Sequence, residues 1–144
     1  MSDTSTSTRV SFGAVLDQPL DLVVETVRDV LAAEGFGVLS TIDVAATLAE
    51  RLDEFHTPYL ILGACNPALA SWALRAEPAI GVLLPCNVVV RETPEGVAVD
   101  FMDPESVLEL IGDPDVAEVA KQVKVRLGRA LDALTDKIGG DPEA

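Results

Sequence analysis

The sequence predicts an α+β protein whose mixed β-sheet is covered by helices mainly on one face. Three observations support this class. Strand-like and helix-like segments alternate in the order β-α-β-α-β-α-β-β-α-α, residues 20–35 carry apolar side chains at helical spacing, and residues 79–101 have the pattern of two strands joined by a turn. Strand-helix crossovers combined with a hairpin indicate a two-layer arrangement with a mixed sheet.

The length and composition of the chain indicate one domain. The chain has 144 residues, of which 49% are hydrophobic. A fold of this length buries about two-thirds of the surface of the unfolded chain, so one core is enough. We therefore expect a single α+β domain over residues 8–138. Residues 1–7 and 139–144 are small and polar, and we expect them to form disordered tails.

The first part of the chain predicts two strands separated by a helix. Alternating apolar residues indicate a strand over residues 8–15. The helix over residues 20–35 follows, with Pro19 at its start and Gly35 as the left-handed residue that closes it. Residues 36–42 have the composition of a second strand.

Two short helices and a strand are predicted next. Asp43 is expected to cap a helix that ends at Leu52, with the side chains of Leu48 and Leu52 facing inward. Residues 59–64 form a continuous apolar run that predicts a strand. Asn66 and Pro67 then have the residue types of an N-cap and a first helical position.

Residues 79–90 are apolar on both alternating faces, which predicts a strand that must be covered on both sides. Pro85 has no amide hydrogen for a ladder, so we expect a bulge or an edge position there. Residues 92–96 predict a turn and residues 97–101 the returning strand. Because two layers cover only one face of a sheet, we expect either a second subunit or a helix that wraps round to cover the other face, and the pattern favours a homodimer.

The C-terminal part predicts two helices, each opened by an Asp-Pro pair. Asp103 and Asp113 are the expected N-caps, and Gly112 is the expected end of the shorter helix. The longer helix carries a stripe of apolar residues that we expect to face the core. This stripe comprises Val116, Val119, Ala120, Val123, Leu127, Ala130, Leu131, Leu134 and Ile138.

The charge of the chain bears on its partners. Twenty-four acidic and 10 basic residues give a formal net charge of −14, which repels phosphate backbones and anionic lipids. We therefore expect neither nucleic acid nor a membrane as a partner. The first residues lack the charge and apolar run of a signal peptide, and no segment approaches the roughly 18 apolar residues of a membrane span, so we expect a cytoplasmic protein.

Each of the two cysteines is followed by asparagine at the edge of an apolar run, and these pairs are the candidate site. A thiol beside a helix N-terminus, as expected for Cys65, can have a lowered pKa and gain reactivity. Cysteine is equally a small buried hydrophobe, and Asn66 can be present only as a cap. If the site binds a small ligand, Asn66, Asn87 and Arg91 supply polar groups near Cys65 and Cys86.

Metal binding and catalysis are weaker interpretations of the same residues. If the two strands are neighbours, the sulfurs of Cys65 and Cys86 can form a reversible disulfide or hold a soft metal. His56 is the only histidine and is imaginable as a third ligand or a base, although a lone loop histidine is usually solvated. The chain has no Gly-rich phosphate loop, serine elbow or Cys-x-x-Cys motif, so the sequence favours no enzyme class and identifies no cofactor.

Four stretches carry a resemblance to a known family. GFGV at 35–38, LGACNP at 62–67, Ala70, and LPCNV at 84–88 resemble the signature of the family called domain of unknown function 302. The resemblance implies a two-layer α/β sandwich with TATA-binding-protein-like topology, found as a homodimer in prokaryotes, with no established activity.

Three hypotheses about function remain after this. The first is a homodimeric cytoplasmic module that binds a small ligand or a partner at the Cys-Asn motifs. The second is a thiol-redox or soft-metal protein that uses Cys65 and Cys86. The third is a structural accessory subunit whose cysteines belong to the core.

Overall fold

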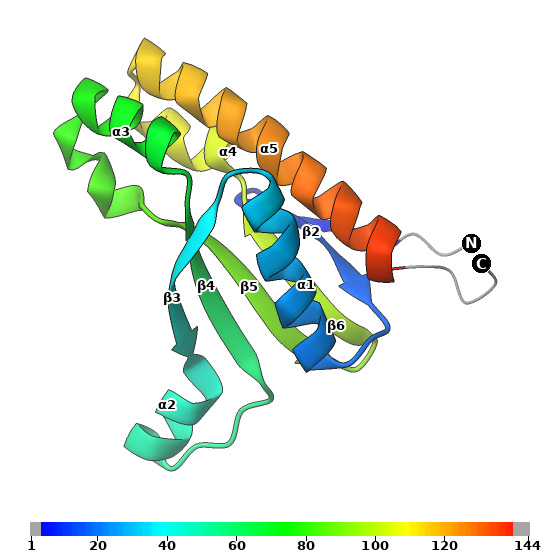
Figure 1. Cartoon of the computed structure of the whole chain (residues 1–144). Coiled ribbons are helices and arrows are strands. Elements are labelled where there is room, and N and C mark those ends of the chain that lie inside the picture. Colours follow the sequence, from blue (N-terminus) through cyan, green and yellow to red (C-terminus); the bar gives the residue numbers. More distant parts are fainter. Residues whose placement is uncertain (1–3, 140–144) are drawn as a thin grey trace.

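The computed structural model describes residues 4–139, which fold into a six-stranded sheet with helices on one face (Figure 1). The strand order is β1-β2-β6-β5-β4-β3, and every neighbouring pair is antiparallel. The strands are β1 (Ser5–Ser7), β2 (Ser11–Leu16), β3 (Gly37–Asp43), β4 (Tyr59–Cys65), β5 (Cys86–Thr93) and β6 (Gly96–Met102).

Five α-helices and two 3₁₀ helices complete the described part of the chain. They are α1 (Leu20–Ala33), α2 (Val44–Leu52), α3 (Pro67–Ala76), α4 (Pro104–Leu108), α5 (Pro114–Ile138), η1 (Pro78–Leu83) and η2 (Glu109–Ile111). None of the helices in residues 4–139 combines the length and the apolar character that crossing a membrane requires.

The two-layer α+β arrangement is confirmed, but the expectation of a mixed sheet is wrong because the sheet is antiparallel throughout. A helix between two strands need not carry the chain across the face of a sheet. In this fold α2 and α3 lie beyond opposite ends of the sheet, so the chain turns back at the end it has just reached (Figure 1). Each returning strand therefore pairs antiparallel with the one before it.

The core lies between the sheet and the pair α1 and α5. Leu62, Val88 and Phe101 stand side by side on β4, β5 and β6 and are fully buried. The α5 stripe predicted to face the core does so, since its buried residues are Val116, Val119, Ala120, Val123, Leu127, Ala130 and Leu134. Burying such a stripe stabilises a helix far more than its intrinsic propensity does.

The N-terminal boundary differs from the prediction. Ser5–Ser7, which we expected in a disordered tail, form β1 and pair with β2. Small polar residues form such a strand when the backbone groups of a neighbour supply the hydrogen bonds. The rest of the predicted tails, residues 1–3 and 140–144, lie outside the described residues.

The predicted strand over residues 79–90 is wrong in its first half. Residues 78–83 form η1, and β5 begins only at Cys86. The side chain of Glu77 accepts a hydrogen bond from the amide of Ala79, at 2.9 Å, which caps η1. On β5 buried and more exposed residues alternate, so the argument for a second subunit from a strand apolar on both faces no longer applies.

Helix α2 begins at the predicted residue but is not buried as expected. Asp43 caps it by accepting a hydrogen bond from the amide of Ala46, at 2.9 Å. No residue of α2 is buried, and the side chain of Leu52 is 65% exposed instead of facing inward. The reason is position, because α2 stands off the end of the sheet, away from α1 and α5 (Figure 1).

Candidate functional site

A pocket of about 390 Å³ lies where the ends of β4 and β5 meet α3 and α5. Its walls are almost entirely apolar and carry no charged side chain. They are formed by Phe36, Leu39, Ser40, Ala64, Cys65, Asn66, Leu69, Ala70, Ala73, Leu74, Leu84, Pro85, Cys86, Leu108, Val119 and Val123. A second hollow, between α4 and α5, contains none of the predicted site residues.

Asn66 has the capping role that its position predicted. Its Oδ1 accepts a hydrogen bond from the amide of Leu69, at 3.2 Å, and Pro67 occupies the first position of α3. The side chain is only 9% exposed and lines the pocket. Asn66 thus fixes the start of α3 at the wall of the pocket.

Cys86 is a buried and weakly acidic thiol. It lies opposite Ala64 in the β4–β5 ladder and is 7% exposed. Burial, and to a lesser degree the neighbouring Cys65, raises the pKa of Cys86 from 9.0 to about 11. The thiol is therefore protonated at neutral pH, and thiols in that form are poor nucleophiles.

Cys65 is the last residue of β4 and is half-buried. It directly follows Ala64, the residue that lies opposite Cys86 in the ladder. Both cysteines are free and both line the pocket. Three of the predicted site residues, Cys65, Asn66 and Cys86, are therefore brought together.

The other predicted residues do not line this pocket. Asn87 is exposed and lies opposite Gly63, on the face of the sheet away from Cys86. Arg91 lies opposite Tyr59 near the far end of β5, where its Nε donates to the carboxylate of Asp100 at 2.9 Å.

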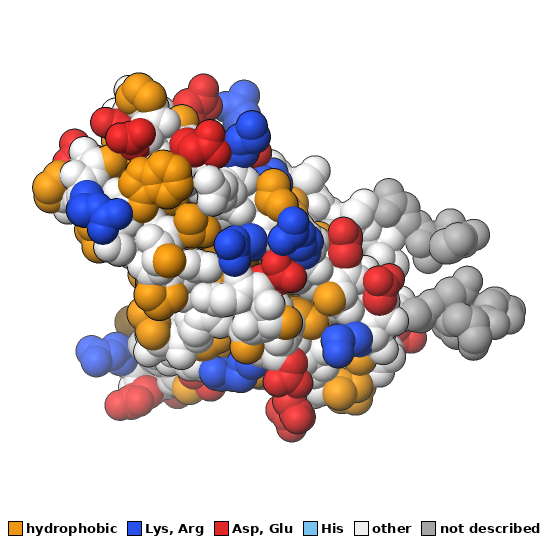
Figure 2. Space-filling view, turned by 45° about the horizontal axis from the view of Figure 1, so that its top comes forward, with side chains coloured by type: hydrophobic (Ala, Val, Ile, Leu, Met, Phe, Trp, Pro, Cys, Tyr) orange, Lys and Arg blue, Asp and Glu red, His pale blue; other side chains and the backbone are white. Residues whose placement is uncertain are grey.

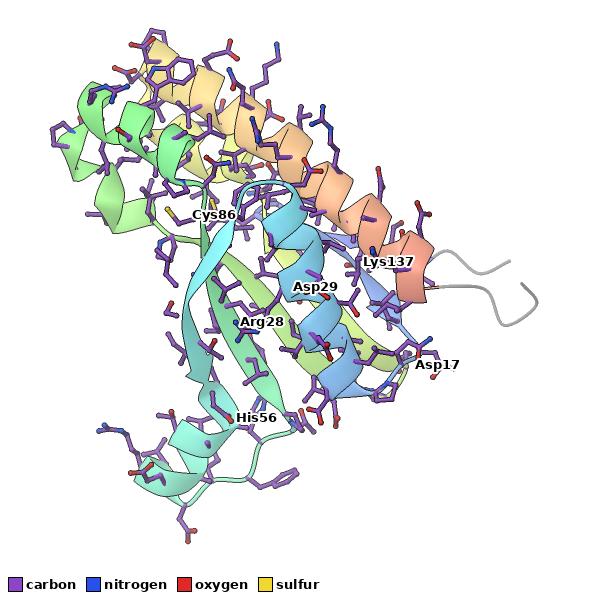
Figure 3. The ribbon with its side chains drawn as sticks, viewed as in Figure 1. Asp17, Arg28, Asp29, His56, Cys86 and Lys137 are labelled. Carbon is purple, nitrogen blue, oxygen red and sulfur yellow. The ribbon has the colours of Figure 1, made fainter. Side chains whose placement is uncertain are left out.

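His56 lies beyond that far end, well away from Cys86 (Figure 3). Its Nδ1 is 2.7 Å from the carbonyl oxygen of Thr57, and its ring meets that of Tyr59 edge-on. The interpretation of His56 as a ligand or base for the cysteines is therefore wrong. Within residues 4–139 no group of three or more His, Cys, Asp and Glu side chains is arranged to hold a metal ion.

Comparison with known proteins agrees with this fold. The family model described as Domain of unknown function DUF302 matches residues 13–134. The chain belongs to this family. It is also similar to the crystal structure of an uncharacterized conserved protein DUF302 from Bacillus stearothermophilus, with 28% identity and a TM-score of 0.82 over 88% of this chain and 99% of that one. No curated protein matches the chain.

All residues that line the pocket lie within the part that matches the DUF302 model. Eight of these 16 residues lie in the stretches that carry the family resemblance, but no sequence signal marked the other eight as pocket residues. Val119 and Val123 were interpreted as core, and Leu69 and Ala73 belong to the apolar face of α3. A residue that packs on its neighbours and one that lines a pocket have the same apolar side chain, so no local signal separates them.

Gly35 lies in the turn between α1 and β3 and directly precedes Phe36, which lines the pocket. It adopts φ of +86°, as predicted for the residue that closes α1. A Cβ at this position would lie 2.9 Å from Nδ2 of Asn66 and 3.6 Å from Nη1 of Arg126. Glycine thus permits both the backbone conformation and the close approach of Asn66.

Proposed function

We propose that this DUF302 protein is a homodimeric module that binds a small, largely apolar ligand in the pocket lined by Cys65, Asn66 and Cys86. The observation that carries the proposal is the pocket itself, which is about 390 Å³ in volume and apolar on nearly every side. Small-molecule sites are commonly concave, apolar and furnished with a few polar groups that orient the ligand.

The chemistry of the walls defines what binds best. Water in an apolar pocket lacks hydrogen-bond partners, so an apolar group that replaces it is favoured by about 25 cal/mol for each Å² buried. The protonated thiol of Cys86 contacts such a group as a small hydrophobe would. The side-chain amide of Asn66, which lines the pocket together with the hydroxyl of Ser40, is the polar group that we expect to orient the ligand.

A binding experiment on two variants of α3 tests this proposal. Ala70 lines the pocket, whereas Ala68 lies on the same helix, is exposed and does not. The neutral fluorescent probe N-phenyl-1-naphthylamine should bind the natural protein and Ala68→Leu alike. In Ala70→Leu the added side chain occupies the pocket, and affinity should fall by about tenfold or more. A probe that does not bind at all, or that binds both variants equally, would contradict the proposal.

The homodimer is supported by a second region, the β3–α2 arm, defined as residues 37–55. Its apolar side chains are unusually exposed, with Leu39 at 72% and Phe55 at 87%. Ile42 and Leu52 on the same arm are also exposed. Exposed apolar side chains concentrated on one element mark protein interfaces, and we propose a second copy of this chain as the occupant.

Sedimentation equilibrium tests the homodimer. The natural protein should sediment as a dimer and the double variant Leu52→Glu, Phe55→Glu as a monomer with unchanged circular dichroism. Val82→Glu, an equally exposed apolar residue outside the arm, is the control and should remain dimeric. A monomeric natural protein rules the proposal out. We further propose a prokaryotic cytoplasmic setting, where the two thiols stay reduced.

A thiol-redox or soft-metal function is the second candidate, because both cysteines line one pocket. In that case mild oxidation should join Cys65 to Cys86, or the reduced protein should retain stoichiometric Zn²⁺ or Cu⁺ after dialysis. Either property must disappear in both Cys65→Ser and Cys86→Ser. If neither property nor probe binding is found, a structural subunit with core cysteines is the remaining interpretation.

A further inference from the structure

The pocket has a polar corner at the end formed by Phe36 and Asn66. The Oδ1 of Asn66 is already used by the amide of Leu69. Its Nδ2 carries two N–H groups that have no hydrogen-bond partner among residues 4–139. The free groups of this nine-tenths buried side chain are therefore donors.

Arg126 brings a positive charge near the same corner, although it lines a separate hollow on α5 and not the pocket itself. It lies on α5 three residues after Val123, which lines the pocket, and its Nη1 is close to the position that a Cβ on Gly35 would take. That nitrogen donates to the carbonyl oxygen of Glu34 at 3.3 Å. The other N–H groups of this guanidinium have no partner in the described part of the chain.

Arg126 differs from the other half-buried basic residues of the described chain in having no carboxylate partner. Three basic residues in the described chain are half-buried, namely Arg91, Lys124 and Arg126. Arg91 pairs with Asp100 at 2.9 Å and Lys124 with Asp103 at 2.7 Å. Arg126 has no carboxylate oxygen within 4.0 Å among residues 4–139, although acidic residues outnumber basic ones 24 to 10.

The surface around the pocket gives no general attraction for anions. Figure 2 shows acidic and basic side chains interspersed, with apolar side chains gathered toward the left of the view, the side on which α3 lies. Recognition of an anion therefore depends on local groups. Arg126 and Asn66 offer only donors at this corner, and their natural complement is an oxyanion, which guanidinium groups bind through charge-assisted hydrogen bonds.

The interior of the pocket is unsuited to the ionised group of a ligand. It has no charged side chain, and an ionised group buried there without a partner would be strongly destabilised. We infer that the ligand is an amphipathic anion whose apolar chain fills the pocket while its carboxylate, or a similar oxyanion, lies at the corner made by Arg126 and Asn66. This inference rests on the proposed function, since it assigns the ligand class of the same pocket.

Three probes with the same chain and different head groups test the inference. Decanoate, 1-decanol and decyltrimethylammonium are titrated against the protein loaded with N-phenyl-1-naphthylamine, at neutral pH and below their micelle concentrations. Decanoate should displace the probe at a concentration about tenfold lower than 1-decanol does, and the cation should be the weakest. The preference, measured relative to each protein's own affinity for the probe, should be about tenfold smaller in Arg126→Gln.

Arg129→Gln is the matched control, because Arg129 lies on the same helix but is exposed and pairs with Glu34. It should keep the preference for decanoate. Equal displacement by all three compounds would overturn the inference and leave the apolar pocket standing. A preference that survives in Arg126→Gln would equally overturn it. Failure of the probe itself to bind the natural protein would instead overturn the proposed function.

Discussion

The two ends of the β4–β5 ladder differ in burial and in charge, although residues from both ends were grouped in one site by the sequence. At one end Ala64 faces Cys86, and the surroundings are apolar and enclosed by α3 and α5. At the other end Tyr59 faces Arg91, which pairs with Asp100, and His56 is exposed nearby (Figure 3). Residue type alone therefore does not define a site. Cys86 and Arg91 are only five positions apart on β5, yet one lies in an apolar environment and the other in a charged one.

The largest expected difference concerns the reactivity of Cys86. A pKa of about 11 leaves roughly a hundredfold less thiolate at neutral pH than a pKa of 9.0 does. In Cys65→Ser, where Cys86 is the remaining thiol, iodoacetamide should react at least about a hundredfold more slowly than with a small free thiol. In Cys86→Ser, the half-buried Cys65 should react with iodoacetamide faster than Cys86 does in Cys65→Ser. Equal rates in the two variants would show that the apolar end does not protect Cys86.

The pH dependence of stability should show the same burial. The folded state holds the Cys86 thiol protonated, with its pKa raised from 9.0 to about 11. Protonation of Cys86 therefore contributes fully to the free energy of unfolding below about pH 9. This contribution is lost as the pH rises toward 11, and the free energy of unfolding falls by roughly 2–3 kcal/mol in all. Urea unfolding of the natural protein and Cys86→Ala from pH 8 to 11 measures this, since the variant lacks the thiol. Parallel curves would contradict the prediction.

A smaller change in the free energy of unfolding is expected for substitutions in the turn between α1 and β3, next to the pocket. Gly35→Ala places a side chain in the left-handed region and against Nδ2 of Asn66, and should lower the free energy of unfolding by about 1–2 kcal/mol. Gly37→Ala is the control, because a Cβ there meets nothing within 4 Å. The midpoint of urea unfolding checks both. Similar losses in the two variants would mean that neither the backbone conformation nor Asn66 restricts position 35.

The smallest change in the free energy of unfolding is expected at the charged end of the β4–β5 ladder. The side chain of Arg91 is 39% exposed, and solvent weakens its ion pair with Asp100. Arg91→Gln should therefore cost less than about 1 kcal/mol and leave binding of the neutral probe unchanged. Fluorescence titration checks the binding. Weaker probe binding in Arg91→Gln would show that both ends of the ladder belong to one site after all.

Helix starts were predictable from the sequence because their signals are local. Asp113 accepts hydrogen bonds from the amides of Asp115 and Val116, at 2.8 and 3.1 Å, and Asp103 and Asn66 cap their helices similarly. Each cap depends on one side chain and the next three residues. Such signals predict where an element begins, but not what it packs against.

The 3₁₀ helix at 78–83 was missed because a continuous apolar run fits a strand and a buried helical turn equally well. One contrary signal was present, since Pro78 has the residue type of a first helical position. The corner at Arg126 had no such signal. In sequence Arg126 belongs to the polar face of α5, and only the folding of the α1–β3 turn against α5 brings it near Asn66.

The irregularity in β3 limits how copies of this chain can join. β3 is the outermost strand and is paired only with β4, so its other side offers backbone groups to any extended chain. The register of β3 shifts between Val38 and Ser40, which places Leu39 outside the regular ladder. A bulge of this kind interrupts the straight row of donors and acceptors that an added strand requires. The irregularity therefore disfavours growth of the sheet from molecule to molecule at this edge, and the dimer that we propose is expected to contact the β3–α2 arm through side chains.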